Sequence, residues 1–108
     1  MSTARIRELN DTFRLDPQRW GRLMITCGVQ EMGAAFVGKA IIAARTFDRF
    51  TPENDPHGEH DFASMIIDGT TVFWKIDYYD KRMEYGSEDP ADPTTTIRVL
   101  SIMLAEEY

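Results

Sequence analysis

Apolar side chains recur at helical spacing near the start of the chain. Ile6, Leu9 and Phe13 fall on one side of a 3.6-residue period, and charged residues fill most of the positions between them. This pattern predicts a short amphipathic helix over residues 3–14. The Asp-Pro step at 16–17 should end that helix, because the residue before proline is pushed out of the α region.

The next two apolar segments predict one strand and the main core helix. Residues 22–27 are a compact apolar run that a glycine ends, which favours a strand. Residues 29–50 carry a broad apolar face at helical spacing. Gly33 interrupts the start of this segment at a cost of about 1 kcal/mol relative to alanine. A short turn followed by a helix that begins at Ala34 is therefore an equal alternative.

Asp68-Gly69 separates two apolar segments and predicts a tight β-hairpin with strands over 62–67 and 70–79. The primed two-residue turn needs positive φ at both central positions, which this dipeptide tolerates. Side chains alternate along the second strand, so one face should be core and the other wet. The core face would carry Trp74, Ile76 and Tyr78, and the wet face Phe73, Lys75, Asp77 and Tyr79.

The last third of the chain predicts one more strand and one more helix. Residues 82–85 are expected to return as a third hairpin strand, and Asp92-Pro93 is typical of a helix start. Apolar residues at helical spacing then predict a final helix, with Ile97, Leu100 and Leu104 on its buried side. The expected fold class is α+β: a small antiparallel sheet of about four strands, covered mainly on one side by two or three helices.

Length and composition indicate one packed domain over residues 1–108. The hydrophobic share is 43% and twelve residues are aromatic, which is typical of a globule and not of a disordered chain. Cys27 is the only cysteine, so no disulfide can form within the chain, and we expect this thiol to be buried. No apolar run has the length of a signal or membrane segment. We therefore expect a soluble, cytoplasmic protein with no membrane partner.

The net charge of −6 is unevenly distributed along the chain. Residues 1–50 carry eight Lys/Arg and five Asp/Glu, whereas residues 51–92 carry three and eleven. This asymmetry favours an acidic face, which would repel DNA and attract basic protein surfaces. An ordinary solubilising surface is the alternative interpretation, because charge of this size is common on small domains.

Residues 55–61 gather both histidines and three carboxylates, and three interpretations of this loop stay open. In the first, His57 and His60 bind a metal ion with Asp61 or Asp77, although the spacing matches none of the strong zinc signatures. In the second, a carboxylate polarises one imidazole for acid-base catalysis, with Glu59 or Asp77 as the partner. No nucleophile, phosphate loop or dinucleotide motif accompanies it.

The third interpretation is structural. Asp55 would begin a turn before Pro56, and His60 and Asp61 would satisfy backbone groups of the approaching strand, so that the loop is fastened to the sheet. Short polar side chains in turns most often serve their own backbone, which favours this interpretation.

Four segments closely resemble the signatures of a domain-of-unknown-function family of short bacterial proteins. They are FTPENDPHGEHDF at 50–62, FWKIDYYD at 73–80, YGSEDPADP at 85–93 and RVLSIMLAEEY at 98–108. Members of that family are often encoded on mobile elements. The resemblance implies no activity, and by association it implies an accessory role such as an anti-restriction or anti-CRISPR inhibitor.

The sequence as a whole favours a small acidic, non-enzymatic binding protein without a cofactor. Its partner would be a protein with a basic surface, such as a nucleic-acid-binding defence complex, and it would not bind nucleic acid directly. The alternative is a small metal-dependent or acid-base hydrolase with its site at residues 57–61. The predicted contact residues are Glu59, Asp61, Lys75, Asp77, Tyr79 and Tyr85.

Overall fold

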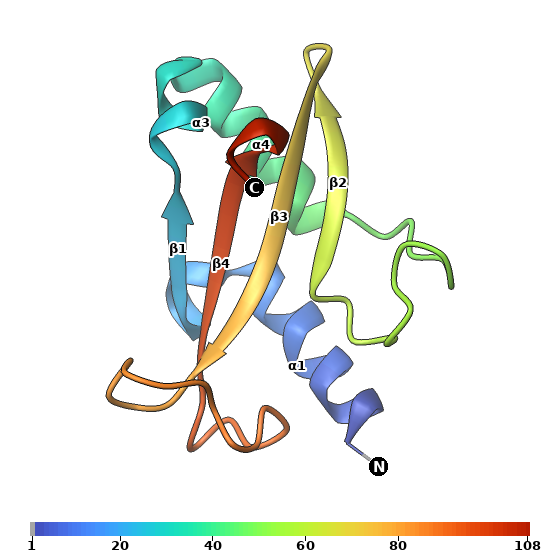
Figure 1. Ribbon diagram of the computed structural model, residues 1–108, viewed down its shortest axis with the longest axis vertical. Coiled ribbons are helices and arrows are strands. Elements are labelled where there is room, and N and C mark those ends of the chain that lie inside the picture. The colour runs from blue at the N-terminus through green and yellow to red at the C-terminus, as the bar shows by residue number, and fades with distance from the viewer. Residues whose placement is uncertain (1) are drawn as a thin grey trace.

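The computed structural model describes residues 2–108, which form helices and a sheet (Figure 1). The α-helices are α1 (Thr3–Leu15), α2 (Pro17–Trp20), α3 (Cys27–Glu31) and α4 (Ala34–Thr46). The strands are β1 (Arg22–Ile25), β2 (Phe62–Ile67), β3 (Thr70–Tyr79) and β4 (Ile97–Leu104), and the 3₁₀ turn η1 (Ala105–Glu107) follows the last strand.

The four strands form one open sheet in the order β1-β4-β3-β2. The pairs β2–β3 and β3–β4 are antiparallel, and the short β1 pairs in parallel with β4. The helices α1 and α4 lie behind this sheet in the view of Figure 1, and the C-terminal turn lies in front of it. The predicted α+β class, with a four-stranded sheet covered mainly on one side, is confirmed, and the sheet is antiparallel as predicted except for the β1–β4 pair.

The hairpin has the predicted ends and turn. Strands β2 and β3 pair from Phe62↔Lys75 to Ile67↔Thr70, and both turn residues have positive φ, 50° at Asp68 and 81° at Gly69. Trp74 is fully buried on the side that faces the helices. Lys75, which follows it, is half-buried on the opposite side. The alternation of β3 therefore separates a core face from a wetter face, as predicted.

Gly33 divides the second helical segment, in agreement with the alternative that begins a helix at Ala34. Its φ of 100° is outside the range that other residues adopt comfortably, so the chain turns there between α3 and α4. The expectation that Cys27 is buried is wrong. The strand ends at Ile25, and Cys27 opens α3 at the surface, where it is exposed.

The predicted final helix is wrong, because residues 97–104 form β4. This strand pairs with β1 on one side and β3 on the other, and it is almost entirely buried. A strand covered on both faces is apolar at nearly every position, so its sequence also matches a helical stripe. Asp92 accepts hydrogen bonds from the backbone N–H and hydroxyl of Thr94, and this local turn replaces the expected helix start.

The predicted third hairpin strand over 82–85 is also wrong. Those residues form turns, and Asp80 Oδ1 accepts the backbone N–H groups of Arg82 and Glu84 at 3.1 Å. A single bridge, between Tyr79 and Gly86, is the only pairing that the described loop makes with β3. Side chain to backbone bonds of this kind compete with a sheet ladder, which is why the segment leaves the sheet.

Candidate functional site

We call the side of the sheet opposite the helices the open face. Its upper part is covered by an aromatic cluster in which Tyr108 packs edge-on against Phe62 and Phe73, with ring centroids 5.7 and 5.5 Å apart. Its lower part is a shallow hollow of about 440 Å³. The residues that line this sheet hollow are Met24, Thr26, Lys75, Asp77, Tyr79, Met83, Val99, Ser101 and Met103.

Three of the predicted contact residues therefore lie together, because alternation along β3 places Lys75, Asp77 and Tyr79 on the open face. Lys75 Nζ and Asp77 Oδ2 form an ion pair of 3.1 Å. Both side chains are about 37% exposed, so the pair contributes at most about 1 kcal/mol to stability. Tyr79 ends the strand at the rim of the sheet hollow.

A second hollow of about 530 Å³ adjoins this rim, in the loop between β3 and β4. We call it the acidic hollow. It is lined by Asp80, Tyr85, Gly86, Glu88, Asp89, Asp92 and Thr95. The bridge between Tyr79 and Gly86 joins it to the open face, and the predicted contact residue Tyr85 is 73% exposed beside it. Two tyrosines and four carboxylates thus meet at one end of the sheet.

Three of these carboxylates shape the loop that carries them. Asp80, Asp89 and Asp92 each accept backbone N–H groups two to four residues ahead, in the manner of Asx turns. The Thr94 hydroxyl and backbone N–H lower the pKa of Asp92, so its carboxyl is ionised at neutral pH. None of the ion pairs among residues 2–108 involves a carboxylate of the acidic hollow.

The predicted contact residue Glu59 lies elsewhere, on the helix side of the sheet. Its carboxylate accepts a hydrogen bond of 3.4 Å from the Tyr78 hydroxyl, and its backbone carbonyl accepts one of 2.9 Å from Asn10 Nδ2. Tyr78 belongs to the face of β3 that faces the helices. The structure therefore does not bring Glu59 together with Tyr79 and Tyr85.

Asp61 extends the hairpin by one residue, since its carbonyl accepts the backbone N–H of Ile76 at 2.8 Å. Burial raises the pKa of its carboxyl, and the charges of Asp55 and Asp77 act in the same direction. No cation forms an ion pair with this side chain among the described residues. The ionised form of Asp61 is therefore disfavoured in the fold.

We expect Asp61→Asn to stabilise the protein at pH 7. The pKa of Asp61 is raised in the folded state, so its carboxyl stabilises the fold fully at pH values below 3.8, its pKa in the unfolded chain. This contribution is lost as the pH rises through the folded-state pKa, and at pH 7 the neutral Asn avoids that loss. The gain should stay below about 1 kcal/mol, since the group is partly solvated, and should vanish near pH 3. Thermal melts of both proteins across this pH range measure it. Asp92→Asn is the control, and it should destabilise at pH 7 because the pKa of Asp92 is lowered.

A buried polar network that sequence reasoning missed lies under α1. Asn10 is fully buried, accepts from Arg98 Nε at 2.7 Å and donates to the Tyr78 hydroxyl at 2.7 Å. Burial raises the pKa of Tyr78, so its hydroxyl stays protonated. The sequence contains one indication of this network. Asn10 lies four residues after Ile6, on the apolar stripe of the first helix, where a polar side chain is expected to be buried.

We call residues 55–61 the histidine loop. It is fastened mainly to α1, and Glu59 and Asp61 make its hydrogen bonds with the sheet. His60 Nδ1 lies 2.8 Å from Asp11 Oδ1, and its ring stacks on Phe50 with centroids 3.7 Å apart. Asp55 begins a turn as predicted, closed by the Gly58 N–H. His57 is exposed. Within residues 2–108, no group of three or more His, Cys, Asp or Glu side chains is placed to hold a metal ion.

Comparison with known proteins gives a family but no activity. A family model described as protein of unknown function (DUF3768) matches residues 25–107, a range that includes the acidic hollow and, except for Met24, the residues that line the sheet hollow. No curated protein and no solved structure matches the chain. None of the helices in residues 2–108 is both long enough and apolar enough to cross a membrane.

Proposed function

The chain belongs to the DUF3768 family of proteins of unknown function, and we propose that it is a small acidic, non-enzymatic binding protein. Its partner would be a protein with a basic surface. The contact would be made by the acidic hollow together with Tyr79 and Tyr85, and the lower part of the open face would extend it.

The observation that carries this proposal is that carboxylates without an ion pair lie beside the exposed Tyr85 and the half-buried Tyr79 at one end of the sheet. A lysine or arginine side chain that entered the acidic hollow would meet carboxylates with no competing ion pair among the described residues. Tyrosines supply large contact area and are enriched among residues that dominate binding energy. Complementary charge would speed association and select a basic partner.

We propose that this partner belongs to a nucleic-acid-processing defence complex, which the chain would inhibit in the cytoplasm. Proteins that bind nucleic acid carry basic surfaces, which an acidic protein can occupy in place of phosphate. The same charge argues against direct DNA binding by this chain. The resemblance to proteins of mobile elements supports a defence target, and a single cysteine suits a reducing compartment.

The hydrolase alternative has less support from the loop at residues 57–61. His60 is paired through Nδ1 with Asp11, and its other ring nitrogen lies 3.6 Å from Asp55 Oδ2. Both nitrogens thus face carboxylates of the protein, which suits a fastening of the loop to α1. A general base needs one free nitrogen within reach of a substrate proton.

Glu88→Lys and Tyr85→Ala test the proposed surface. Neither side chain makes a hydrogen bond or ion pair among the described residues, so both variants should fold like the wild type. With a partner captured from the native host cell, Tyr85→Ala should weaken binding by about 2 kcal/mol. Glu88→Lys should weaken it most at low salt, where charge is least screened. Calorimetric titration at two salt concentrations measures both effects.

Glu31→Lys is the matched control, because it makes the same charge change at an exposed position on α3. It should leave the partner complex close to wild type. Equal loss of binding in Glu88→Lys and Glu31→Lys would show that net charge, and not the acidic hollow, governs the interaction. Tight, salt-sensitive binding of the wild type to duplex DNA in a mobility-shift titration would contradict the proposal altogether.

A further inference from the structure

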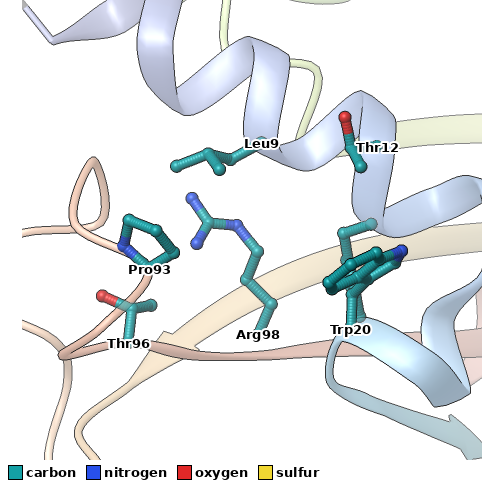
Figure 2. Close-up of a pocket in the computed structure, with 7 residues that line it drawn as sticks. Leu9, Thr12, Trp20, Pro93, Thr96 and Arg98 are labelled. Carbon is teal, nitrogen blue, oxygen red and sulfur yellow. The ribbon is translucent and has the colours of Figure 1, made fainter.

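A separate pocket of about 230 Å³ lies on the helix side of the molecule, between α1, α2 and the end of the loop before β4. Its walls are mostly apolar and include Leu9 and Phe13 from α1, Trp20 from α2 and Pro93 from the loop. The side chain of Arg98 extends from β4, and its guanidinium lies between Leu9 and Pro93 (Figure 2). An apolar pocket with one convergent charged group is the usual form of a small-molecule site.

Arg98 is only 5% exposed, yet it has no carboxylate partner among the described residues. Its Nε donates to the amide oxygen of Asn10, and Nη2 donates to the carbonyl of Pro90. Both acceptors are neutral. Within residues 2–108 the remaining nitrogen, Nη1, forms no hydrogen bond, and it is not fully buried.

A buried cation without an anion is unfavourable, and proteins usually pair it. Burial lowers the pKa of Arg98, and the nearby charge of Arg5 acts in the same direction, while Tyr78 and Glu59 oppose it. The guanidinium nevertheless stays protonated, because arginine does not lose its proton in proteins. A ligand carboxylate that reached this guanidinium would supply the missing negative charge in a low-dielectric setting, where such a bond is strongest.

We propose that this pocket binds a small organic monocarboxylate with an apolar body. The carboxylate would accept from Arg98, and the apolar part would lie against Leu9, Phe13 and the indole of Trp20. The volume is below that of pockets for drug-sized ligands, so it suits an acid with a single ring or a short chain. Trp20 is 55% exposed in the free protein, and an apolar ligand would cover part of that surface.

Titration with phenylacetate, followed by the indole N–H signals of ¹⁵N-labelled protein in NMR spectra, tests this site. The chain has two tryptophans, and only Trp20 lines the pocket, because Trp74 is buried in the core. We expect a saturable shift of the Trp20 signal with little change at Trp74. Phenylacetamide, which has the same ring but no charge, should bind at least about tenfold more weakly, since it loses a charge-assisted hydrogen bond.

Thr12→Trp provides a variant that leaves the buried network intact. Thr12 is exposed on α1 and lines the pocket, so a large side chain there should fill the space and weaken phenylacetate binding by at least about tenfold. Ala4→Trp is the control, exposed on the same helix and away from the pocket, and it should bind like the wild type.

Three results would overturn the inference. They are the absence of a saturable shift at Trp20 with phenylacetate, equal affinity for phenylacetate and phenylacetamide, and undiminished binding in Thr12→Trp. The proposed protein contact is tested separately, because Glu88 and Tyr85 do not line this pocket. Glu88→Lys should therefore bind phenylacetate like the wild type.

Discussion

Trp74→Ala should unfold most of the protein, because it opens the largest cavity that one substitution can make in this core. Trp74 is the largest fully buried side chain, and the rings of Phe47 and Phe50 pack edge-on against it. Removing a buried tryptophan costs about 3–5 kcal/mol, which is comparable to the whole stability of many small domains. The guanidinium of Arg14, whose Cζ lies 4.6 Å from the centroid of the Trp74 ring, would also lose this aromatic neighbour.

Tyr79→Ala is the comparison, since Tyr79 lies on the same strand and on the opposite face. It is half-buried at the rim of the sheet hollow, so the loss of stability should be about 1 kcal/mol or less. Urea titrations followed by circular dichroism would give both values. If Tyr79→Ala melted the protein and Trp74→Ala left it intact, the core would lie on the other face of the sheet.

The hairpin was predictable because two independent signals agree on it. The Asp68-Gly69 dipeptide fixes the turn, and the alternation along β3 fixes which face is buried. Each signal is local, so a single sequence contains it. The first helix was predictable for the same reason, since its apolar stripe has the helical period.

Strand β4 was missed because its burial depends on the rest of the fold. It lies between β1 and β3 and its residues are buried on both faces, so they show no alternation that would distinguish a strand from a buried helix. Its partner β1 is 77 residues earlier in the chain, since Arg22 pairs with Val99. A local sequence pattern contains no information about a pairing between residues so far apart in the chain.

The part of the candidate site that lies on a strand can be predicted from the sequence, whereas the part that lies on loops cannot. Lys75, Asp77 and Tyr79 follow from the alternation of one strand, which sequence shows directly. Glu59 lies apart from them because the direction of a loop depends on its tertiary contacts, here the hydrogen bonds of residues 58 and 59 with Arg7, Asn10 and Tyr78. The acidic hollow needed the turns at Asp80 and Asp92, which replaced the predicted strand and helix.

The buried network under α1 joins elements that are far apart in sequence, and the pocket at Arg98 depends on it. Asn10 connects α1 to β4 through Arg98, to β3 through Tyr78 and to the histidine loop through the carbonyl of Glu59. The amide suits this position because it offers both an acceptor and two donors. A charged or apolar side chain of similar size would leave at least one of these partners unsatisfied.

Asn10→Ala should therefore be the most damaging polar substitution that we predict in the chain. It would remove the acceptor from a buried guanidinium and the donor from both the Tyr78 hydroxyl and the Glu59 carbonyl, at a loss of about 3 kcal/mol or more. Asn54→Ala is the control, because Asn54 also bonds backbone groups but is exposed, where water replaces lost bonds. Its loss should be about 1 kcal/mol or less. Urea titrations measure both, and equal losses would show that the network under α1 contributes no more than an ordinary surface turn.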